Sequence, residues 1–577
     1  IINNAGIYTP ETNEFQPLDL PRPPDKPADP QQWLLNDMFC SGHLHLPDGN
    51  VLFLSGTQFY DPFNGAKTAY IFDWKKQQWI DAGRPHDGHW YPNMVPLEDG
   101  RLVAFGGYSY KTPNNSSVMS PYIEIFDPAR FDPTARHKAW SYVDARELQH
   151  SPWQTPLWPG GVIKDTFMFY PRNVSLPDGR ILLTRNGAGG NPGSTRNTYL
   201  VRIGPRPTNP GEVSTVTFVP GPERPDVYRT YGTAVVDPTN GNILLIGGQK
   251  GPRHGSPGNL LHGPSPYDEA GVTVTADLDI YHLPDAEHPK GHWEQVPNFL
   301  GDTPFETRMM HYAVILPTKQ ILVVDGGNFS YQHPVFFPQL LTPDATARGG
   351  YRVGRMNEAL QPRLYHSGAF LLPDGRVFTV SGNASRASYD IKEKSVDLSV
   401  YQGPPGMYFR AEKGQYKIPA EIWVAEIFSP PYLFLPGLRP EIGKIGTWPV
   451  KTGEADVTEL DYGQNYTVDV TKIVPSCALS EASLVLIKLG SVTHSWDSGQ
   501  RLIDLAIETV SNALLFPTES YTQKGPEPYP TENTGELVFT APKQGPTTPP
   551  GFYMMFYVDC RGKPSKAKMV QLTPRGN

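Results

Sequence analysis

Four residues with reactive side chains recur at one position of a repeated sequence pattern. Cys40, Tyr91, Tyr170 and His366 each lie eight residues before the aspartate of an Asp-Gly turn. Thiol, phenol and imidazole groups can bind transition metals and take part in redox or acid–base chemistry. If the repeat places equivalent positions at one end of the molecule, these groups converge on one site. The alternative is ordinary polarity at a rim where an apolar wall meets water.

The repeat is an apolar stretch, a turn, a second apolar stretch and a closing glycine. Asp-Gly or Asn-Gly between two apolar runs is typical of a β-hairpin. Six copies occur, at residues 44–56, 95–107, 174–187, 235–248, 314–327 and 370–382. In the fourth copy the position equivalent to Tyr91 is taken to be Tyr231, and in the fifth copy His311.

Several copies continue into a further apolar strand, a turn and a distal aromatic residue, which predicts blades of four strands. Such units at intervals of about 50 residues, with loop insertions, are typical of a kelch-type β-propeller. The N-terminal stretch 6–15 resembles the outer half of one more blade. We therefore predict seven blades, with the ring closed by joining the two chain ends of the propeller. The first strand of each blade would line the central axis. Residues at the same position of each repeat are therefore predicted to lie close together.

The pattern changes near Ile427 to strand-like runs such as SLVLIKLG and GFYMMFYVD. These runs predict an immunoglobulin-like β-sandwich. The predicted organisation is all-β, with a propeller over residues 1–426 and a sandwich over residues 427–577.

Composition supports an all-β protein and excludes some partners. The chain has 62 prolines, 55 glycines and 19% charged residues, which favours short strands joined by turns. A net charge of −8 without a basic run argues against a nucleic-acid partner. No apolar run is long enough to predict a membrane span. Six Asn-x-Ser/Thr sequons suit a secreted, periplasmic or cell-surface protein. Cys477 and Cys560 could pair, leaving Cys40 alone, and the oligomeric state is left open.

Five segments extend this interpretation beyond the repeat. They are DMFCSGHLHLPDG, HWYPNMVPLEDGR, PRLYHSGAFLLPDGRVF, EIFSPPYLF and SVTHSWDSGQR. In this order they closely resemble the signature segments of the copper radical oxidases, the galactose oxidase and glyoxal oxidase family. The resemblance runs from about Cys40 to near the C-terminus.

The resemblance implies a role for five residues. Cys40 would form a thioether cross-link to the ring of Tyr91, giving a tyrosyl radical cofactor. Tyr91, Tyr365, His366 and His494 would bind one copper ion, with one position left open. His494 would arrive on a hairpin loop of the second domain that penetrates the propeller. Without the resemblance, Tyr365 and His366 would be interpreted as a packed pair at a strand end, and His494 as a loop histidine without a partner.

The implied reaction is oxidation of a primary alcohol or aldehyde, small or carbohydrate-linked, by O2 with release of hydrogen peroxide. Tyr365 would accept the substrate proton and the Tyr91 radical would take a hydrogen atom from the adjacent carbon. The alternative is a non-catalytic kelch-type module that binds a glycan or a protein. That module has no reason to keep the five residues together. A propeller hydrolase would need a carboxylate pair or an arginine cluster at the axis, which the in-phase positions do not offer.

One departure concerns the tryptophan that galactose oxidase stacks over its cross-link. Here the matching position is Ser109, flanked by Tyr108 and Tyr110. Trp153 or Trp158 could supply the stacking surface instead, or could simply pack a long loop.

Further rim residues are left open between two roles. Arg172 could meet a carboxylate or hydrated aldehyde of the substrate, or bind the scaffold. Arg229, Tyr231 and His311 could line the pocket or only form the rim.

Overall fold

The computed structural model describes most of the chain. The described residues are 5–18, 38–60, 63–111, 117–154, 167–188, 196–209, 211–226, 229–250, 273–301, 307–327, 334–382, 389–390, 395–396, 409–410, 416–417, 422, 424–449, 455–473, 481–511 and 533–574. The helical segments among these residues are short 3-10 turns, such as η2 (Pro128–Arg130) and η10 (Pro431–Phe434). Within this part of the chain, no helix is long and apolar enough to cross a membrane.

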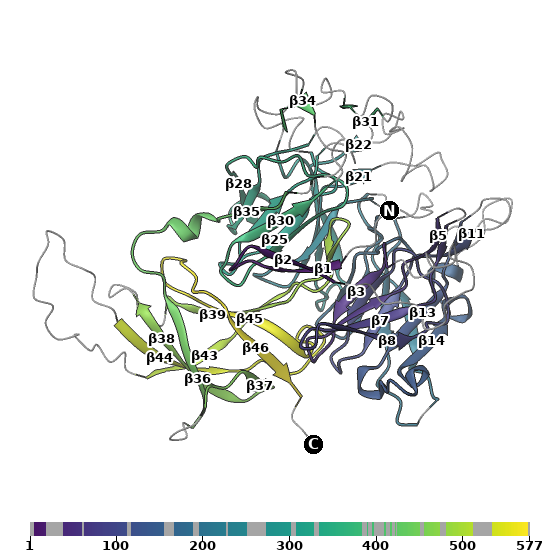
Figure 1. The fold of residues 1–577 in the computed structure, drawn as a ribbon, viewed down its shortest axis with the longest axis horizontal. Helices are drawn as coiled ribbons and strands as arrows, with labels where there is room; N and C mark the ends of the chain where they lie inside the picture. Colours follow the sequence, from purple (N-terminus) through teal and green to yellow (C-terminus); the bar gives the residue numbers. More distant parts are fainter. Residues whose placement is uncertain are drawn as a thin grey trace, which may run out of the picture.

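Six antiparallel sheets of three or four strands follow one another in the described residues of the first three quarters of the chain (Figure 1). Five have four strands and the sixth has three. The first two contain β3 (Gly42–His45), β4 (Val51–Leu54), β7 (Ala69–Asp73) and β8 (Gln78–Gly83), then β9 (Asn93–Pro96), β10 (Leu102–Phe105), β13 (Tyr122–Phe126) and β14 (Trp140–Asp144). The next two contain β15 (Asn173–Ser175), β16 (Arg180–Leu183), β17 (Tyr199–Ile203) and β18 (Val216–Pro220), then β19 (Thr233–Val236), β20 (Ile243–Ile246), β23 (Leu278–His282) and β24 (His292–Val296). The last two contain β25 (Tyr312–Ile315), β26 (Ile321–Val324), β27 (Gln339–Pro343) and β28 (Tyr351–Arg355), then β29 (Ser367–Leu371), β30 (Val377–Ser381) and β35 (Glu426–Phe428).

The inner hairpin of each sheet is set by the predicted turn. In the first, Gly49 donates its N–H to the carbonyl of Leu46 at 3.0 Å and has a φ of 87°. Glycine adopts this left-handed conformation without steric cost because it has no Cβ. The fifth hairpin has Lys319 at this place, with a φ of 63°.

The first strands of these sheets lie around a common axis. Strands β3, β9 and β15 lie side by side, as do β19, β25 and β29. The N-terminal strands β1 (Ala5–Thr9) and β2 (Glu14–Leu18) form a two-stranded sheet. This sheet packs near the sixth one, where Tyr8 lies 5.0 Å from Phe378, measured between ring centroids. The predicted all-β class is confirmed. The described residues contain six sheets of blade size and the separate two-stranded β1–β2 sheet, so a seventh blade stays a prediction.

The C-terminal part forms two packed sheets. One contains β36 (Glu441–Thr447), β38 (Asn465–Ile473), β44 (Asn533–Thr540) and β43 (Ala506–Ser511). The other contains β37 (Glu459–Asp461), β46 (Lys568–Thr573), β45 (Gly551–Val558), β39 (Ser483–Lys488) and β42 (Leu502–Asp504). In Figure 1 these sheets, in green and yellow, lie against one side of the purple-to-teal sheets.

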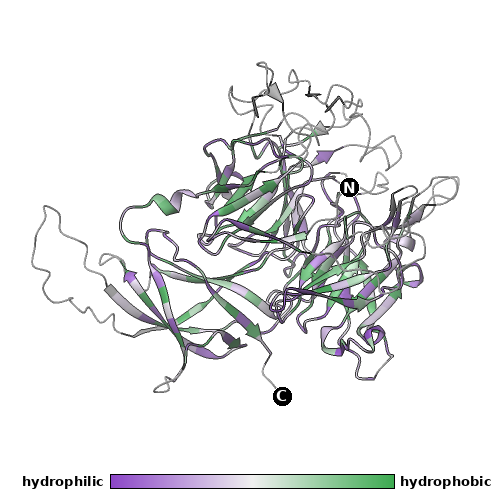
Figure 2. Ribbon diagram, viewed as in Figure 1, coloured by the Kyte–Doolittle hydropathy of each residue, from purple (hydrophilic) through white to green (hydrophobic). Residues whose placement is uncertain are grey.

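Strand β39 explains how the two parts are joined. Its side chains alternate between the two faces of the sheet. Leu484 and Leu486 are buried in the core between the two C-terminal sheets. Val485 and Ile487 are buried against the fourth to sixth sheets of the propeller. The strand is therefore apolar at successive positions because both of its faces are covered. Figure 2 shows many hydrophobic residues, in green, on the strands of both parts.

Candidate metal and radical site

The residues at the repeated position share an unusual backbone conformation at the start of the inner strands. Each has a positive φ, which is rare for a residue with a side chain. The values are 66° for Cys40, 71° for Tyr91, 38° for Tyr170, 55° for Tyr231, 62° for Met310 and 64° for His366. Such conformations persist where the surrounding structure imposes them, and they concentrate at functional sites.

Backbone hydrogen bonds connect these positions around the axis. Tyr91 N–H donates to the carbonyl of Cys40 at 3.0 Å, and Tyr170 N–H donates to that of Tyr91 at 2.7 Å. Met310 N–H likewise donates to the carbonyl of Tyr231 at 3.0 Å. The repeat therefore brings these residues together at one end of the ring.

The assignment of the fifth copy to His311 was wrong by one residue. Met310 has the positive φ and makes the backbone contact to Tyr231. His311 is fully buried and its ring lies against Gly247 of the neighbouring sheet, in the packing between blades. Burial, followed by the charge of Arg308, lowers its pKa to about 3.

His494 reaches the axis at the tip of a hairpin from the C-terminal part. Strands β40 (Val492–Thr493) and β41 (Trp496–Asp497) pair, and the two residues between them are His494 and Ser495. Both have a positive φ, 44° and 66°, as a two-residue type I′ turn requires. The hairpin contacts the inner strands β19, β25 and β29. It therefore lies inside the ring.

The base of this hairpin is held by polar contacts to the ring and to itself. Asp497 accepts hydrogen bonds from the backbone of Ser491 at 2.8 Å and of Gly499 at 3.0 Å. Gln500 pairs with β25, donating to the carbonyl of Ala313 at 2.6 Å. Trp496 Nε1–H donates to Oδ1 of Asn93 at 3.2 Å.

Arg172 fixes the tip. Its guanidinium donates to the carbonyls of Tyr170 at 2.6 Å and Gly232 at 3.2 Å, and also to the carbonyl of His494. The side chain is fully buried. Of the two roles left open for Arg172, these contacts describe binding to the scaffold.

Three donor atoms converge at the tip. The hydroxyl oxygens of Tyr91 and Tyr365 are 2.6 Å apart. Nε2 of His494 lies 3.0 Å from the Tyr91 oxygen and 3.3 Å from the Tyr365 oxygen. Nδ1 of His494 lies 2.8 Å from Oγ1 of Thr493. A neutral ring with hydrogen on Nδ1 satisfies both sides, since Nδ1 donates to Thr493 and the Nε2 lone pair points toward the phenols.

The other two predicted residues lie next to these donors. The ring of His366 is 3.7 Å from that of Tyr365 and 5.1 Å from that of His494, measured between centroids. Cys40 is buried, packs in the same cluster as Tyr91 and Tyr365, and is outside any disulfide. The structure thus brings all five predicted residues together, while their roles as ligands and cross-link stay predictions.

Burial controls the protonation of this cluster. Burial, followed by His366 and Arg172, holds the pKa of His494 well below 6.5, so the imidazole is neutral. Burial, followed by Cys40 and Tyr365, raises the pKa of Tyr91 well above 10.0, so its phenol keeps its proton. A cation at the cluster would reverse the second effect by favouring the phenolate.

Trp90 supplies a stacking surface that sequence reasoning missed. Its ring lies 3.9 Å from that of Tyr91 at an interplanar angle of 10°. Tyr170 covers the ring of Tyr91 as well, at 4.5 Å and 28°. Trp153 instead packs against Phe167, and Trp158 lies outside the described residues. The signal for Trp90 was its place directly before Tyr91 in the HWYP segment.

The remaining candidates take structural positions. Arg229 forms a buried ion pair with Asp279, so it binds the scaffold. The ring of Tyr231 meets that of Tyr365 edge-on at 6.1 Å. Cys560 is disulfide-bonded, and Cys477 lies outside the described residues.

The donor set fits copper. Neutral imidazole and phenolate oxygen are ligands that suit Cu(II). Tyr91, Tyr365 and His494 direct their donor atoms to one buried point, with His366 beside it.

Two family models match parts of the chain. Residues 290–404 match the glyoxal oxidase N-terminus, and residues 449–572 match the galactose oxidase-like Early set domain. The second match covers most of the two C-terminal sheets.

Similar proteins were found among curated sequences and solved structures. An aldehyde oxidase GLOX of Vitis pseudoreticulata is 26% identical, over 98% of this chain and 84% of its own length. A galactose oxidase of Gibberella zeae is 23% identical, over 93% of this chain and 61% of its own length. A fungal alcohol oxidase solved in complex with copper superposes with a TM-score of 0.61 at 18% identity, over 99% of this chain and 90% of that one.

Proposed function

We propose that this chain, a relative of the glyoxal oxidases and galactose oxidases, is a mononuclear copper radical oxidase. Its substrate would be an aldehyde or a primary alcohol, with O2 as the acceptor. The observation that carries the proposal is the convergence of the Tyr91 and Tyr365 hydroxyls with Nε2 of His494, within 2.6 to 3.3 Å, at a buried point. A glycan- or protein-binding module has no use for this arrangement.

Copper would be held by Tyr91, Tyr365, His366 and His494, and when bound it would supply a one-electron redox partner and favour loss of the substrate hydroxyl proton. Tyr365 would accept that proton at its hydroxyl oxygen. Tyr91, as a radical, would take a hydrogen atom from the adjacent carbon. Two electrons and two protons then pass to O2, so each substrate oxidised yields one hydrogen peroxide.

The proposed cofactor includes a thioether between Cys40 and Tyr91. Support comes from the backbone hydrogen bond between the two residues and from their common buried cluster. Trp90 and Tyr170 cover the Tyr91 ring and would keep water away from it.

An aldehyde is the first substrate class to test. The aldehyde oxidase of Vitis pseudoreticulata matches over most of both chains, whereas the galactose oxidase matches over a smaller share of its own length. A hydrated aldehyde presents the hydroxyl and the adjacent C–H that the proposed chemistry needs.

We further propose that the propeller extends through β35, which pairs with β30 up to Phe428, two residues beyond the predicted boundary, and that the sandwich follows it. We also propose that the protein is secreted or lies at the cell surface. The disulfide at Cys560 and the sequons support an oxidising compartment.

Peptide mapping of the copper-loaded, air-exposed protein tests the proposal. The Cys40 and Tyr91 peptides should run as one species, about 2 Da lighter than their sum, because forming the S–C bond removes two hydrogens. Cys40→Ser is the matched control and should give separate peptides. The wild type should then release peroxide with aldehydes or primary alcohols. Separate wild-type peptides and no peroxide with either class would overturn the proposal in favour of a binding module.

A further inference from the structure

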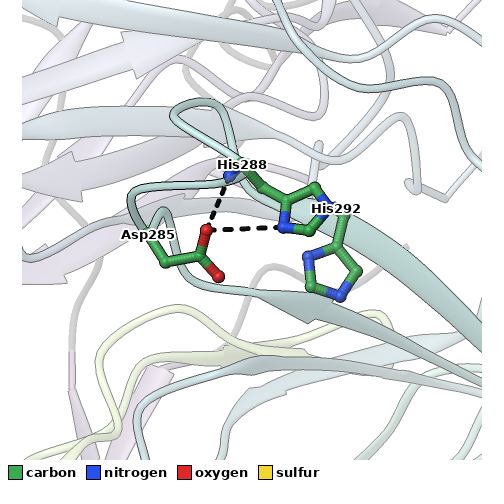
Figure 3. Close-up of side chains that lie close together, drawn as sticks. All are labelled: Asp285, His288 and His292. Carbon is green, nitrogen blue, oxygen red and sulfur yellow. Dashed lines mark hydrogen bonds and ion pairs between the residues drawn. The ribbon is translucent and has the colours of Figure 1, made fainter.

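A cluster of histidines lies on the fourth sheet, on strands other than those that form the proposed copper site. His282 ends β23 and His292 begins β24, and the two are directly paired across the strands. The connecting loop, 283–291, carries Asp285 and His288. Figure 3 shows the side chains of Asp285, His288 and His292 gathered at this loop.

Three of these residues present ligand atoms to a common point. One ligand atom each from Asp285, His288 and His292 lies within 4.8 Å of the others. Nδ1 of His292 is buried and makes no hydrogen bond within the described structure. All hydrogen bonds and ion pairs assigned to the Asp285 carboxylate fall on Oδ1, so Oδ2 is available.

Backbone hydrogen bonds of the loop keep these groups close together. Asp285 Oδ1 accepts the backbone N–H of Glu287 at 2.9 Å and of His288 at 2.6 Å. Gly291, with a φ of 70°, donates its N–H to the carbonyl of His288 at 2.8 Å. The three groups are thus positioned by the turn, with Asp285 and His288 exposed to solvent.

Neighbouring groups orient the third ligand. The ring of His282 stacks on that of His292 at 4.5 Å and 14°. His282 Nε2 is itself 2.9 Å from Oε2 of Glu294. The stacked ring of His282 packs against one face of the His292 ring and limits its orientation.

We propose that Asp285, His288 and His292 form a surface site for a divalent transition-metal ion of the zinc type, with water completing the shell. Two imidazoles and one carboxylate with an open position are a known zinc donor set, at ligand distances of about 2.0–2.2 Å. The three ligand atoms lie within 4.8 Å of one another. Rotamer changes of the exposed Asp285 and His288 side chains can bring these atoms to the shorter separations that a bound ion requires. The site does not depend on the proposed oxidase function.

Zinc titration of the copper-loaded protein tests this site, with the bound zinc counted by mass spectrometry and the affinity measured by calorimetry. The wild type should bind one equivalent of Zn²⁺. His288→Gln and Asp285→Asn, both at exposed positions, should each weaken zinc binding by about tenfold or more. His137→Gln replaces an exposed histidine elsewhere and should leave binding unchanged.

His494→Ala separates this site from the axis. A zinc equivalent that survives in His494→Ala and disappears in His288→Gln places the ion at the loop. No zinc equivalent in the wild type overturns the proposal, as does an equivalent unaffected by His288→Gln and Asp285→Asn. Loss of oxidase activity would leave this result untouched.

Discussion

The indole of Trp90 lies flat on the phenol ring of Tyr91, 3.9 Å away between ring centroids. The indole N–H donates to Oγ1 of Thr57 at 3.1 Å, which holds the indole in this orientation. An electron-rich ring held against a phenol can spread unpaired spin and exclude water. The pair therefore connects packing at the axis with the lifetime of the proposed radical.

Replacing Trp90 with Leu should shorten the lifetime of the radical without removing copper. The substitution removes an aromatic pair worth about 0.5–1.5 kcal/mol beyond its buried area. Electron paramagnetic resonance of the oxidised protein should show faster decay of the radical, and Trp90→Phe should fall between the two. Trp74→Phe, at an exposed tryptophan, serves as the control. Equal decay in Trp90→Leu and wild type would show that Trp90 only fills space.

Replacing His494 with Ala should weaken copper binding by at least about tenfold, because one nitrogen donor is lost from the cluster. Copper stoichiometry after dialysis against a chelator measures the effect, and His137→Gln is the control. Full retention of copper in His494→Ala would remove His494 from the ligand set.

Arg172 should act as a positioning residue for His494. Arg172→Met leaves the carbonyls of Tyr170, Gly232 and His494 without their donor, at a cost of about 1–3 kcal/mol for each buried group. We expect an altered electron paramagnetic resonance spectrum of the copper and a lower kcat. Arg172→Lys should restore part of both. An unchanged spectrum with only a lower melting temperature would mean that Arg172 stabilises the fold without placing the histidine.

Acid should destabilise the protein partly through His311. Burial lowers its pKa to about 3 in the folded state, from an ordinary value of 6.5, so the unfolded chain takes up a proton between these limits and the folded chain does not. Folding stability from this group is complete above pH 6.5 and falls as the pH drops, by about 3 kcal/mol at pH 4. Asp325, whose pKa burial raises to about 7, contributes in the opposite direction.

The difference between wild type and His311→Leu isolates this effect. Denaturant unfolding at pH 7 and pH 4 should show a smaller loss of stability in the variant. His137→Leu should behave like the wild type. Equal losses in wild type and His311→Leu would show that the His311 proton is not linked to folding.

Local signals were enough to predict the repeats and the proximity of three site residues, whereas Tyr365 and His494 were predicted from the family resemblance. Asp-Gly turns set the hairpins, and equal phase then placed Cys40, Tyr91 and His366 together. The fifth copy was misread because its turn has Lys319 in place of glycine, which hid the register and shifted the assignment from Met310 to His311.

The place of Trp90 directly before Tyr91 was the only sequence signal for the stack. Successive residues of a strand point to opposite faces, so adjacency alone does not predict that the two rings lie parallel. The left-handed φ of 71° at Tyr91 breaks this alternation and lets the neighbouring rings lie parallel. Nothing in the residue types announces a left-handed tyrosine, since that conformation is imposed by the ring of blades.

The hairpin that carries His494 makes the proposed metal site depend on docking of the C-terminal sheets. His494 and Tyr91 meet across 403 positions of sequence, and each belongs to a different set of sheets. A chain whose C-terminal sheets have not docked lacks the nitrogen at the axis and has an incomplete donor set. Metal capture would then report on docking, and oxidative chemistry could begin only in a molecule whose two parts are already joined.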